Sequence, residues 1–204
     1  MSEPWRKFFE RKNSLLEFSV SILLLVIVLF ALSRFLKFVE LRNGVILDDP
    51  ILKFLYPADF STLIFLIIYL SVFASLFYLI RKPDLLVVAI QSYTLLLILR
   101  IIAMYLIPLN PPANTIPLID PLVMAFGTGE VLTKDLFFSG HTALLFLLFL
   151  VVGNRTLKTS FFILTFILAF LLLKQHVHYS IDVFCAPIFS YTSYKIILSL
   201  RSRI

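Results

Sequence analysis

The sequence predicts an all-α, polytopic membrane protein with six transmembrane helices, and three observations support this fold class. Hydrophobic residues make up 60% of the 204-residue chain and charged residues 15%, and the mean hydropathy of +1.00 is far from that of a soluble domain. Six apolar runs each come near the roughly 17–25 residues that a helix needs to cross a bilayer. These runs are residues 15–36, 60–80, 85–107, 136–153, 157–173 and 179–200.

The first run is interpreted as a retained span, because it is longer than a signal-peptide core and no small-residue cleavage pattern follows it. Ahead of it, residues 5–13 (WRKFFERKN) mix aromatic and basic side chains, which predicts an interfacial segment attracted to anionic lipid. Six spans leave almost no chain for a soluble domain. Residues 1–204 are therefore expected to form one membrane domain that starts with a short, cytoplasmic amphipathic segment, residues 1–13.

The positions of the charges predict the orientation of the spans. With the amino terminus inside, 11 of the 18 basic residues lie on the inner side, whereas the outer side carries six basic residues diluted by seven acidic ones, as the positive-inside rule expects. Both termini are expected to be cytoplasmic, and this distribution, rather than a nucleic-acid partner, accounts for the net charge of +6. The 11 are Arg6, Lys7, Arg11, Lys12, Arg81, Lys82, Arg155, Lys158, Lys195, Arg201 and Arg203.

Two long connections are expected on the outer side, at about 38–59 and 108–135, and they hold seven of the ten prolines. Long loops among short ones are candidates for function. The chain has a single cysteine, Cys185, inside the last span. One cysteine cannot form an intramolecular disulfide and matches no zinc-binding spacing.

All three histidines, His141, His176 and His178, fall at the outer ends of spans. Asp182 follows His178 by four residues, a spacing that puts carboxylate and imidazole on one helix face, one turn apart. The carboxylate can then fix the ring tautomer and support a positive imidazolium. An aspartate inside a span costs roughly 2.5–3.5 kcal/mol on insertion scales, so it is retained only with a partner or a wet cavity. A buried hydrogen bond that ties helices together is the structural alternative.

The tripeptide Ser139-Gly140-His141 predicts an anion site at the start of the fourth span. The serine can cap the helix, and the glycine permits a close backbone approach or an unusual dihedral. Free amide donors at such a helix end attract phosphate, and His141 would stand beside them, able to exchange a proton with a phosphate oxygen. This tripeptide and the His178–Asp182 pair lie about 37 residues apart across one helical hairpin, which predicts a shared site.

These motifs carry a family resemblance. Residues 134–142 (KDLFFSGHT) and 178–182 (HYSID) are similar to the two histidine motifs of the sphingomyelin synthase family, within the superfamily of type 2 phosphatidic-acid phosphatases. Asp135 matches the family's aspartate six residues before the first histidine. Residues 100–108 resemble its arginine-bearing third-span motif, and residues 44–65 resemble its first outer loop more loosely. The resemblance covers most of residues 44–190.

The resemblance implies a lipid phosphotransferase that works through a phosphohistidine at the outer leaflet. It implies that His178 is the nucleophile, that Asp182 orients it, and that His141 protonates the departing lipid alkoxide and then deprotonates the acceptor hydroxyl. The expected donor is a phospholipid, and the expected acceptor is ceramide or diacylglycerol. The expected substrate-binding residues are Arg100, Asp135, Ser139, Gly140 and Tyr179, with Arg100 and the fourth-span amides holding the phosphoryl oxygens.

The sequence also departs from the phosphatase branch of the superfamily. It lacks the lysine-arginine-proline motif and the serine-arginine pair of that branch, and Leu172 stands six residues before the final histidine. These departures favour the transferase-like branch. Two alternatives stay open: a lipid phosphate phosphatase or diesterase that uses water as acceptor, and a non-enzymatic membrane scaffold whose His–Asp pair is structural.

Several residues near the motifs have structural alternatives. Arg100 can tie helices together or snorkel to the interface, and His176 is expected to be an interfacial residue at a loop end. Asp135 can pair with a histidine or a headgroup amine, and Tyr179 is expected to be an interfacial aromatic whose hydroxyl can reach substrate. No cofactor or metal is expected, because too few carboxylates lie near the site for an oxygen-ligand cage.

Overall fold

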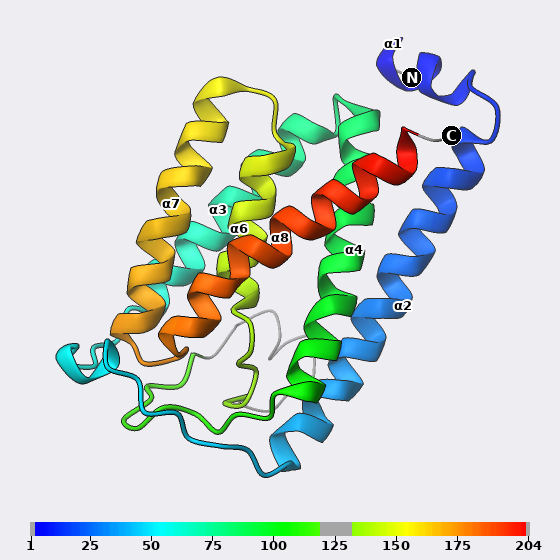
Figure 1. The fold of residues 1–204 in the computed structure, drawn as a ribbon. Coiled ribbons are helices and arrows are strands. Elements are labelled where there is room, and N and C mark those ends of the chain that lie inside the picture. Colours follow the sequence, from blue (N-terminus) through cyan, green and yellow to red (C-terminus); the bar gives the residue numbers. More distant parts are fainter. Residues whose placement is uncertain (1–2, 119–131, 203–204) are drawn as a thin grey trace.

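A computed structural model of the protein describes residues 3–118 and 132–202. Asp120, Pro121 and Glu130 of the second predicted outer loop, and Arg203, lie outside these residues. The described part is helical, with a single isolated bridge between Val45 and Leu109 (Figure 1). The elements are α1 (Glu3–Phe9), α2 (Ser14–Leu41), the 3-10 turn η1 (Leu52–Phe54), α3 (Ser61–Leu79), α4 (Pro83–Leu106), α6 (Gly140–Val151), α7 (Arg155–Lys174) and α8 (Ser180–Arg201).

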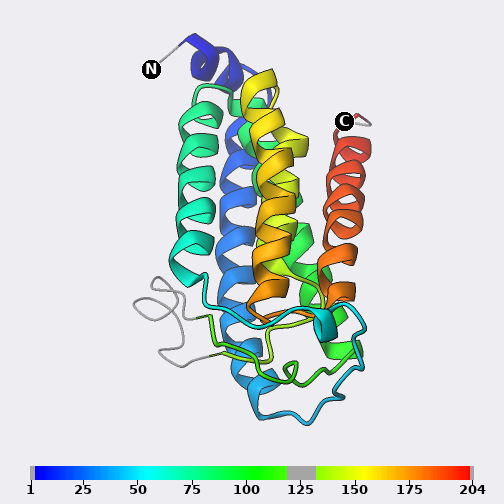
Figure 2. The ribbon, with the colours of Figure 1, turned by 90° about the vertical axis from the view of Figure 1, so that its left-hand side faces the viewer.

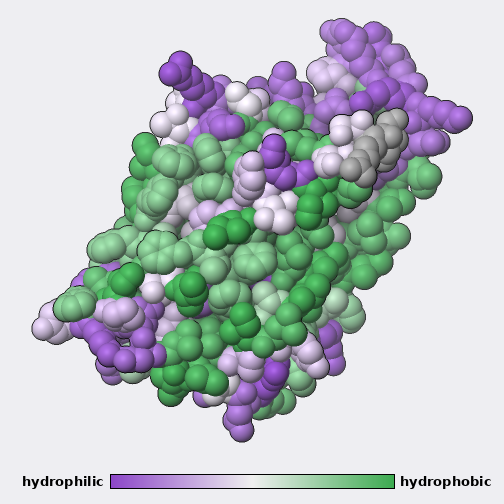
Figure 3. Space-filling view, in the orientation of Figure 1, coloured by the Kyte–Doolittle hydropathy of each residue, from purple (hydrophilic) through white to green (hydrophobic). Residues whose placement is uncertain are grey.

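Five helices of the described part are long and apolar enough to cross a membrane: α2, α3, α4, α7 and α8. Their large apolar side chains are widely exposed, for example Phe30 of α2, Phe73 of α3 and Phe166 of α7. The space-filling view shows a largely hydrophobic middle between hydrophilic ends (Figure 3). A bundle with such sides buries them in lipid. The predicted all-α, polytopic membrane fold is confirmed.

The fourth predicted span is shorter as a helix than its apolar run. Helix α6 has 12 residues, about 18 Å of rise, and begins at Gly140, whereas residues 136–139 are not helical. Leu136 and Phe138 are fully buried in this segment. No residue of α6 is exposed, because α4, α7 and α8 pack around it. Non-helical backbone at membrane depth is tolerated where protein surrounds it.

Helices α4, α6 and α8 form the centre of the bundle, and their buried side chains make one core cluster. Helix α2 packs on the outside of α4 through Val28 and Leu32, and α3 packs against α6 and α7 through Ile64 and Ile68. Figures 1 and 2 show that the axes of most long helices are roughly aligned, whereas α8 crosses α4 obliquely.

The two ends of the bundle differ in content. Both termini lie at one end, together with the α3–α4 and α6–α7 turns (Figure 1). There α1 is fixed by Trp5, which donates to the Ile80 carbonyl, and Arg11 contacts Asp84. The opposite end holds the two long connections and the amino termini of α6 and α8. The two histidine motifs therefore meet at the end that lacks the termini.

Candidate active site

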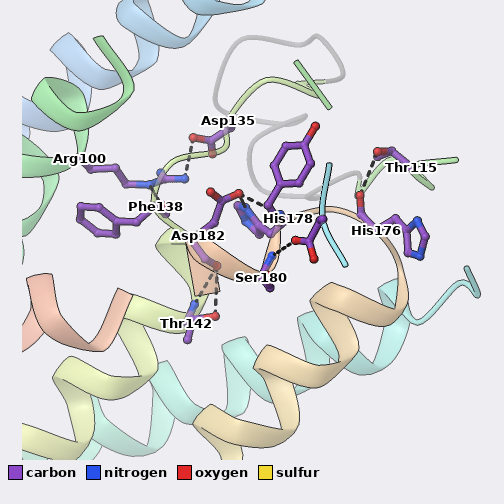
Figure 4. Close-up of polar contacts among 12 residues, drawn as sticks. Arg100, Thr115, Asp135, Phe138, Thr142, His176, His178, Ser180 and Asp182 are labelled. Atoms are coloured by element: carbon purple, nitrogen blue, oxygen red, sulfur yellow. Dashed lines mark hydrogen bonds and ion pairs between the residues drawn. The ribbon is translucent and has the colours of Figure 1, made fainter. Parts of the chain in front are cut away.

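The centre of the site is the pair His178 and Asp182. His178 lies just before Tyr179, the N-cap of α8, and Asp182 is the third residue of that helix. The Asp182 carboxylate Oδ2 lies 3.3 Å from His178 Nδ1 and accepts a 3.0 Å hydrogen bond from the Tyr179 amide (Figure 4). The pair meets through this N-terminal capping geometry rather than along one helix face, because His178 itself is not helical.

The contact fixes the tautomer of His178. An ionised carboxylate only accepts hydrogen bonds, so beside ionised Asp182 a neutral His178 carries its proton on Nδ1 and keeps the lone pair on Nε2. Both side chains are almost fully buried, at 2% and 0% exposure. Among the residues that the structure describes, Asp182 Oδ1 has no hydrogen-bond partner. The carboxylate therefore favours any positive charge that develops on the ring of His178.

The amino terminus of α6 is joined directly to this pair. Ser139 is the N-cap of α6, as predicted, and its Oγ accepts from the Thr142 amide. The Ser139 amide donates to the Asp182 carbonyl at 3.0 Å. Further along the two helices, Ser190 Oγ donates to the Ala143 carbonyl. These bonds join α6 to α8, so the two histidine motifs lie side by side.

Arg100 reaches the same place from α4. Its side chain is 7% exposed, Nε donates to the Phe138 carbonyl at 3.0 Å, and Nη2 forms a 2.6 Å ion pair with Asp135 Oδ1 (Figure 4). Asp135 thus pairs with the arginine, whereas the sequence suggested a histidine or a headgroup amine as its partner. A guanidinium held from two sides has a fixed plane, which suits recognition of phosphoryl oxygens.

Gly140 makes room for this arginine. A Cβ at position 140 would lie 2.7 Å from Arg100 Cζ and 2.8 Å from Nη1, closer than real side-chain contacts. The glycine is therefore used for a close approach, which brings the guanidinium against the first turn of α6. A cation and the free amides of a helix start together make a strong site for an anion.

A cavity of about 310 Å³ lies between the two histidine motifs and Arg100. Its polar end is lined by Arg100, Asp135, Gly140, His141 and His178. Its other wall is apolar and comes from three helices: Leu29, Leu32 and Leu36 of α2, Ile68 of α3, and Leu96 and Leu97 of α4. The cavity therefore offers a charged end for a phosphate and an apolar wall for hydrocarbon.

Tyr179 and His176 lie outside this cavity lining. Tyr179, expected to bind substrate, is 1% exposed, and its hydroxyl donates to the Asn110 carbonyl at 3.0 Å while it accepts from the Leu47 amide at 3.2 Å. His176, expected at an interface, is 5% exposed and turned away from His178 (Figure 4). Its ring nitrogens lie 3.0 Å and 2.8 Å from the carbonyl oxygens of Ala113 and Leu55.

Sequence reasoning missed the residues that hold the outer loops against α8. Asp49 is the main one: Oδ2 accepts from the Ser180 amide at 2.6 Å, and Oδ1 accepts from the Ile51 and Leu52 amides. Burial alone would raise the pKa of Asp49, but these hydrogen bonds outweigh it and lower the pKa below the usual 3.8. A short-range pattern could not show this role, because Ser180 lies 131 residues away.

No group of three or more His, Cys, Asp or Glu side chains among the described residues is arranged to hold a metal ion.

The carboxyl-terminal part of the chain resembles a known protein family. Residues 134–199, about a third of the sequence, match the family described as PAP2 superfamily C-terminal. This region contains both histidine motifs, and the match supports the type 2 phosphatidic-acid phosphatase superfamily and a lipid phosphatase or phosphotransferase type of function. No curated protein matches the chain.

Proposed function

We propose that this protein is a membrane lipid phosphotransferase of the sphingomyelin synthase type, which moves a phospholipid headgroup phosphate to ceramide or a related lipid alcohol. The observation that supports it most is the buried His178–Asp182 contact at a cavity that also contains His141 and Arg100. This arrangement supplies a nucleophile, an orienting acid, a proton carrier and an anion site in one place.

In the first half-reaction, His178 Nε2 attacks phosphorus and the bond from phosphorus to the glyceride oxygen breaks. His141 gives a proton to the departing oxygen, which leaves as diacylglycerol. The ring of His178 gains positive character as the nitrogen–phosphorus bond forms, and Asp182 beside Nδ1 stabilises it. Arg100 and the α6 amides hold the phosphoryl oxygens as their charge grows.

In the second half-reaction, the hydroxyl of the acceptor takes the place of diacylglycerol. His141, now neutral, removes the hydroxyl proton, the oxygen attacks phosphorus, and the nitrogen–phosphorus bond breaks. His178 returns to its starting state and His141 is again protonated. Both the leaving group and the acceptor are lipids, so the apolar wall of the cavity can hold the chains of each in turn and exclude water.

Leu172 supports the transferase type over an ordinary phosphatase. The phosphatase branch is expected to have an arginine six residues before the final histidine, but Leu172 is fully buried against Ile64 and Leu168. Among the described lining residues, Arg100 is the basic side chain of the cavity. We further propose that the active site faces the outer leaflet and that both termini are cytoplasmic, because basic residues gather at the end of the bundle that holds the termini.

The test is a mass-spectrometric assay of purified protein in mixed micelles that contain phosphatidylcholine, phosphatidylethanolamine or phosphatidylinositol, each with and without ceramide. A phosphosphingolipid that forms only with ceramide and intact His178 is the expected product. The His178→Ala variant, checked for folding by thermal denaturation, is the matched control.

Two other outcomes would replace the proposal. Diacylglycerol and phosphocholine, or free phosphate, accumulating equally with and without ceramide would identify a hydrolase that uses the same histidines. A His178→Ala variant that loses its fold together with its function would favour the scaffold alternative, in which the His–Asp pair is structural.

A further inference from the structure

A second cavity lies at the other end of the bundle, far from the histidines. It is a groove of about 820 Å³ between α2, α4 and the carboxyl-terminal part of α8. In Figure 1 this is the region where α8 crosses α4 and approaches the start of α2. The groove shares no lining residue with the catalytic cavity, so it is a separate site.

The walls of the groove are suited to hydrocarbon. They are lined by Leu16, Val20 and Leu24 of α2, Leu95 and Ile98 of α4, and Ile197 and Leu200 of α8. Leu16, Leu24 and Leu200 are 63%, 48% and 52% exposed. In a membrane-spanning bundle such side chains face acyl chains rather than water.

The inner surface of the groove is closed by a polar network. Arg201 of α8 contacts Glu17 of α2 and Gln91 of α4, and Gln91 donates to Ser21 Oγ at 2.9 Å. These contacts tie the three helices together, and the charge of Arg201 is balanced by Glu17. They leave Glu17 neutralised within the network.

The mouth of the groove carries an excess of positive charge. Arg11 ion-pairs with Asp84 at 2.5 Å, and Arg201 is already paired with Glu17 in the network, which leaves Lys12 among the basic residues that line the groove. Lys12 is exposed and makes no hydrogen bond or ion pair with any residue that the structure describes. One uncompensated cation therefore stands where the apolar walls end, at the depth of lipid headgroups.

We propose that this groove binds an anionic phospholipid from the leaflet at the basic end of the protein, with its phosphate at Lys12 and an acyl chain along Leu16, Val20 and Leu24. The proposal does not depend on the proposed function. A membrane-adjacent lysine attracts anionic lipid by about 1 kcal/mol, or about fivefold in occupancy. The bound lipid would fill the space that separates the exposed faces of α2 and α8.

The experiment places a fluorescent reporter in the groove of the full-length protein. The chain has one tryptophan, so Leu24→Trp is made in a Trp5→Phe background and reconstituted with brominated phosphatidylglycerol or brominated phosphatidylcholine. Phe166→Trp is the matched control, since Phe166 lies 60% exposed on α7 outside the groove and at a similar distance from its helix start. Lys12→Ala tests the headgroup contact, and Lys195→Ala removes an exposed lysine from the same end, outside the groove lining.

The expected result is stronger quenching by brominated phosphatidylglycerol than by brominated phosphatidylcholine at position 24 and equal quenching at position 166. Lys12→Ala should reduce the preference at position 24 about fivefold, whereas Lys195→Ala should leave it unchanged. Equal quenching by the two lipids at position 24 would overturn the proposal. Absence of quenching at position 24, with normal quenching at position 166, would show that protein covers the groove, and would also overturn it.

Discussion

Two buried histidines lie in the turn before α8, and their surroundings differ. His176 lies between two backbone carbonyl oxygens and has a φ of 56°, a left-handed value that non-glycine residues rarely adopt. His178 lies against a buried carboxylate and lines the cavity that contains Arg100. The residues are two positions apart, yet His176 holds loops together, whereas His178 is the nucleophile of the proposed function.

The partners of each histidine account for the different roles proposed for the two residues. A backbone carbonyl oxygen lies within 3.0 Å of each ring nitrogen of His176, so neither nitrogen is open to a substrate. A carboxylate on Nδ1 alone leaves Nε2 of His178 available as a nucleophile. The substitutions predicted below separate a chemical role from a structural one, in order of decreasing effect.

The largest effect is expected for the pair itself. His178→Ala should lower the transfer or hydrolysis rate at least about 10⁴-fold, because no nucleophile remains, and Asp182→Asn should lower it roughly 10³- to 10⁴-fold, because a neutral amide neither fixes the tautomer nor supports charge. Rates are measured on purified protein, alongside thermal denaturation curves. The amide that Asp182→Asn introduces retains an oxygen for the Tyr179 N–H, so a folded variant with normal activity would show that the carboxylate has no chemical role.

The second effect concerns the fit of Arg100 against α6. Gly140→Ala places a methyl group 2.7 Å from Arg100 Cζ, which should push the guanidinium aside and lower kcat/KM about 10²-fold. Gly153→Ala is the matched control, because its new methyl group meets only the Tyr78 hydroxyl, at 3.2 Å. Equal kcat/KM values for the two alanine variants would mean that the position of Arg100 does not matter for the reaction.

A smaller effect is expected for the other histidine. His176→Ala removes the contacts with Leu55 and Ala113, which should lower the free energy of unfolding by about 1–3 kcal/mol and the Tm by roughly 2–4 °C for each kcal/mol. The rate at 25 °C should stay within about threefold of the parent rate, because the cavity does not include this side chain. A loss of activity as large as that of His178→Ala, in folded protein, would contradict this assignment.

The smallest effect is expected for Asp49 and depends on pH. Its pKa is lowered in the folded state, so the stabilisation that its carboxylate gives is complete above the unfolded value of about 3.8 and is lost as the pH falls through the lower folded value. Asp49→Asn should lower the Tm at pH 7 by a few degrees and flatten its decline below about pH 4. Parallel Tm–pH curves for the two proteins would exclude the contribution of this carboxylate.

The sequence by itself determined the membrane fold and the two histidine motifs. Helix positions follow from long apolar runs, which must satisfy their own backbone hydrogen bonds in lipid. The His178–Asp182 contact and the Ser139 cap depend on residues three or four positions apart, so local geometry defines them. For Gly140 the sequence left a close approach and an unusual dihedral both open, and the contact with Arg100 decided for the close approach.

Only the tertiary structure decided which residues surround those motifs. Asp135 forms an ion pair with Arg100, Asp49 accepts a hydrogen bond from Ser180, and Tyr179 donates one to Asn110. The partners are 35, 131 and 69 residues apart in the sequence. Much of the apolar wall of the cavity comes from α2, which contains neither histidine motif. Such contacts depend on how helices pack side by side, and packing depends on shape and burial summed over many residues, which short motifs do not record.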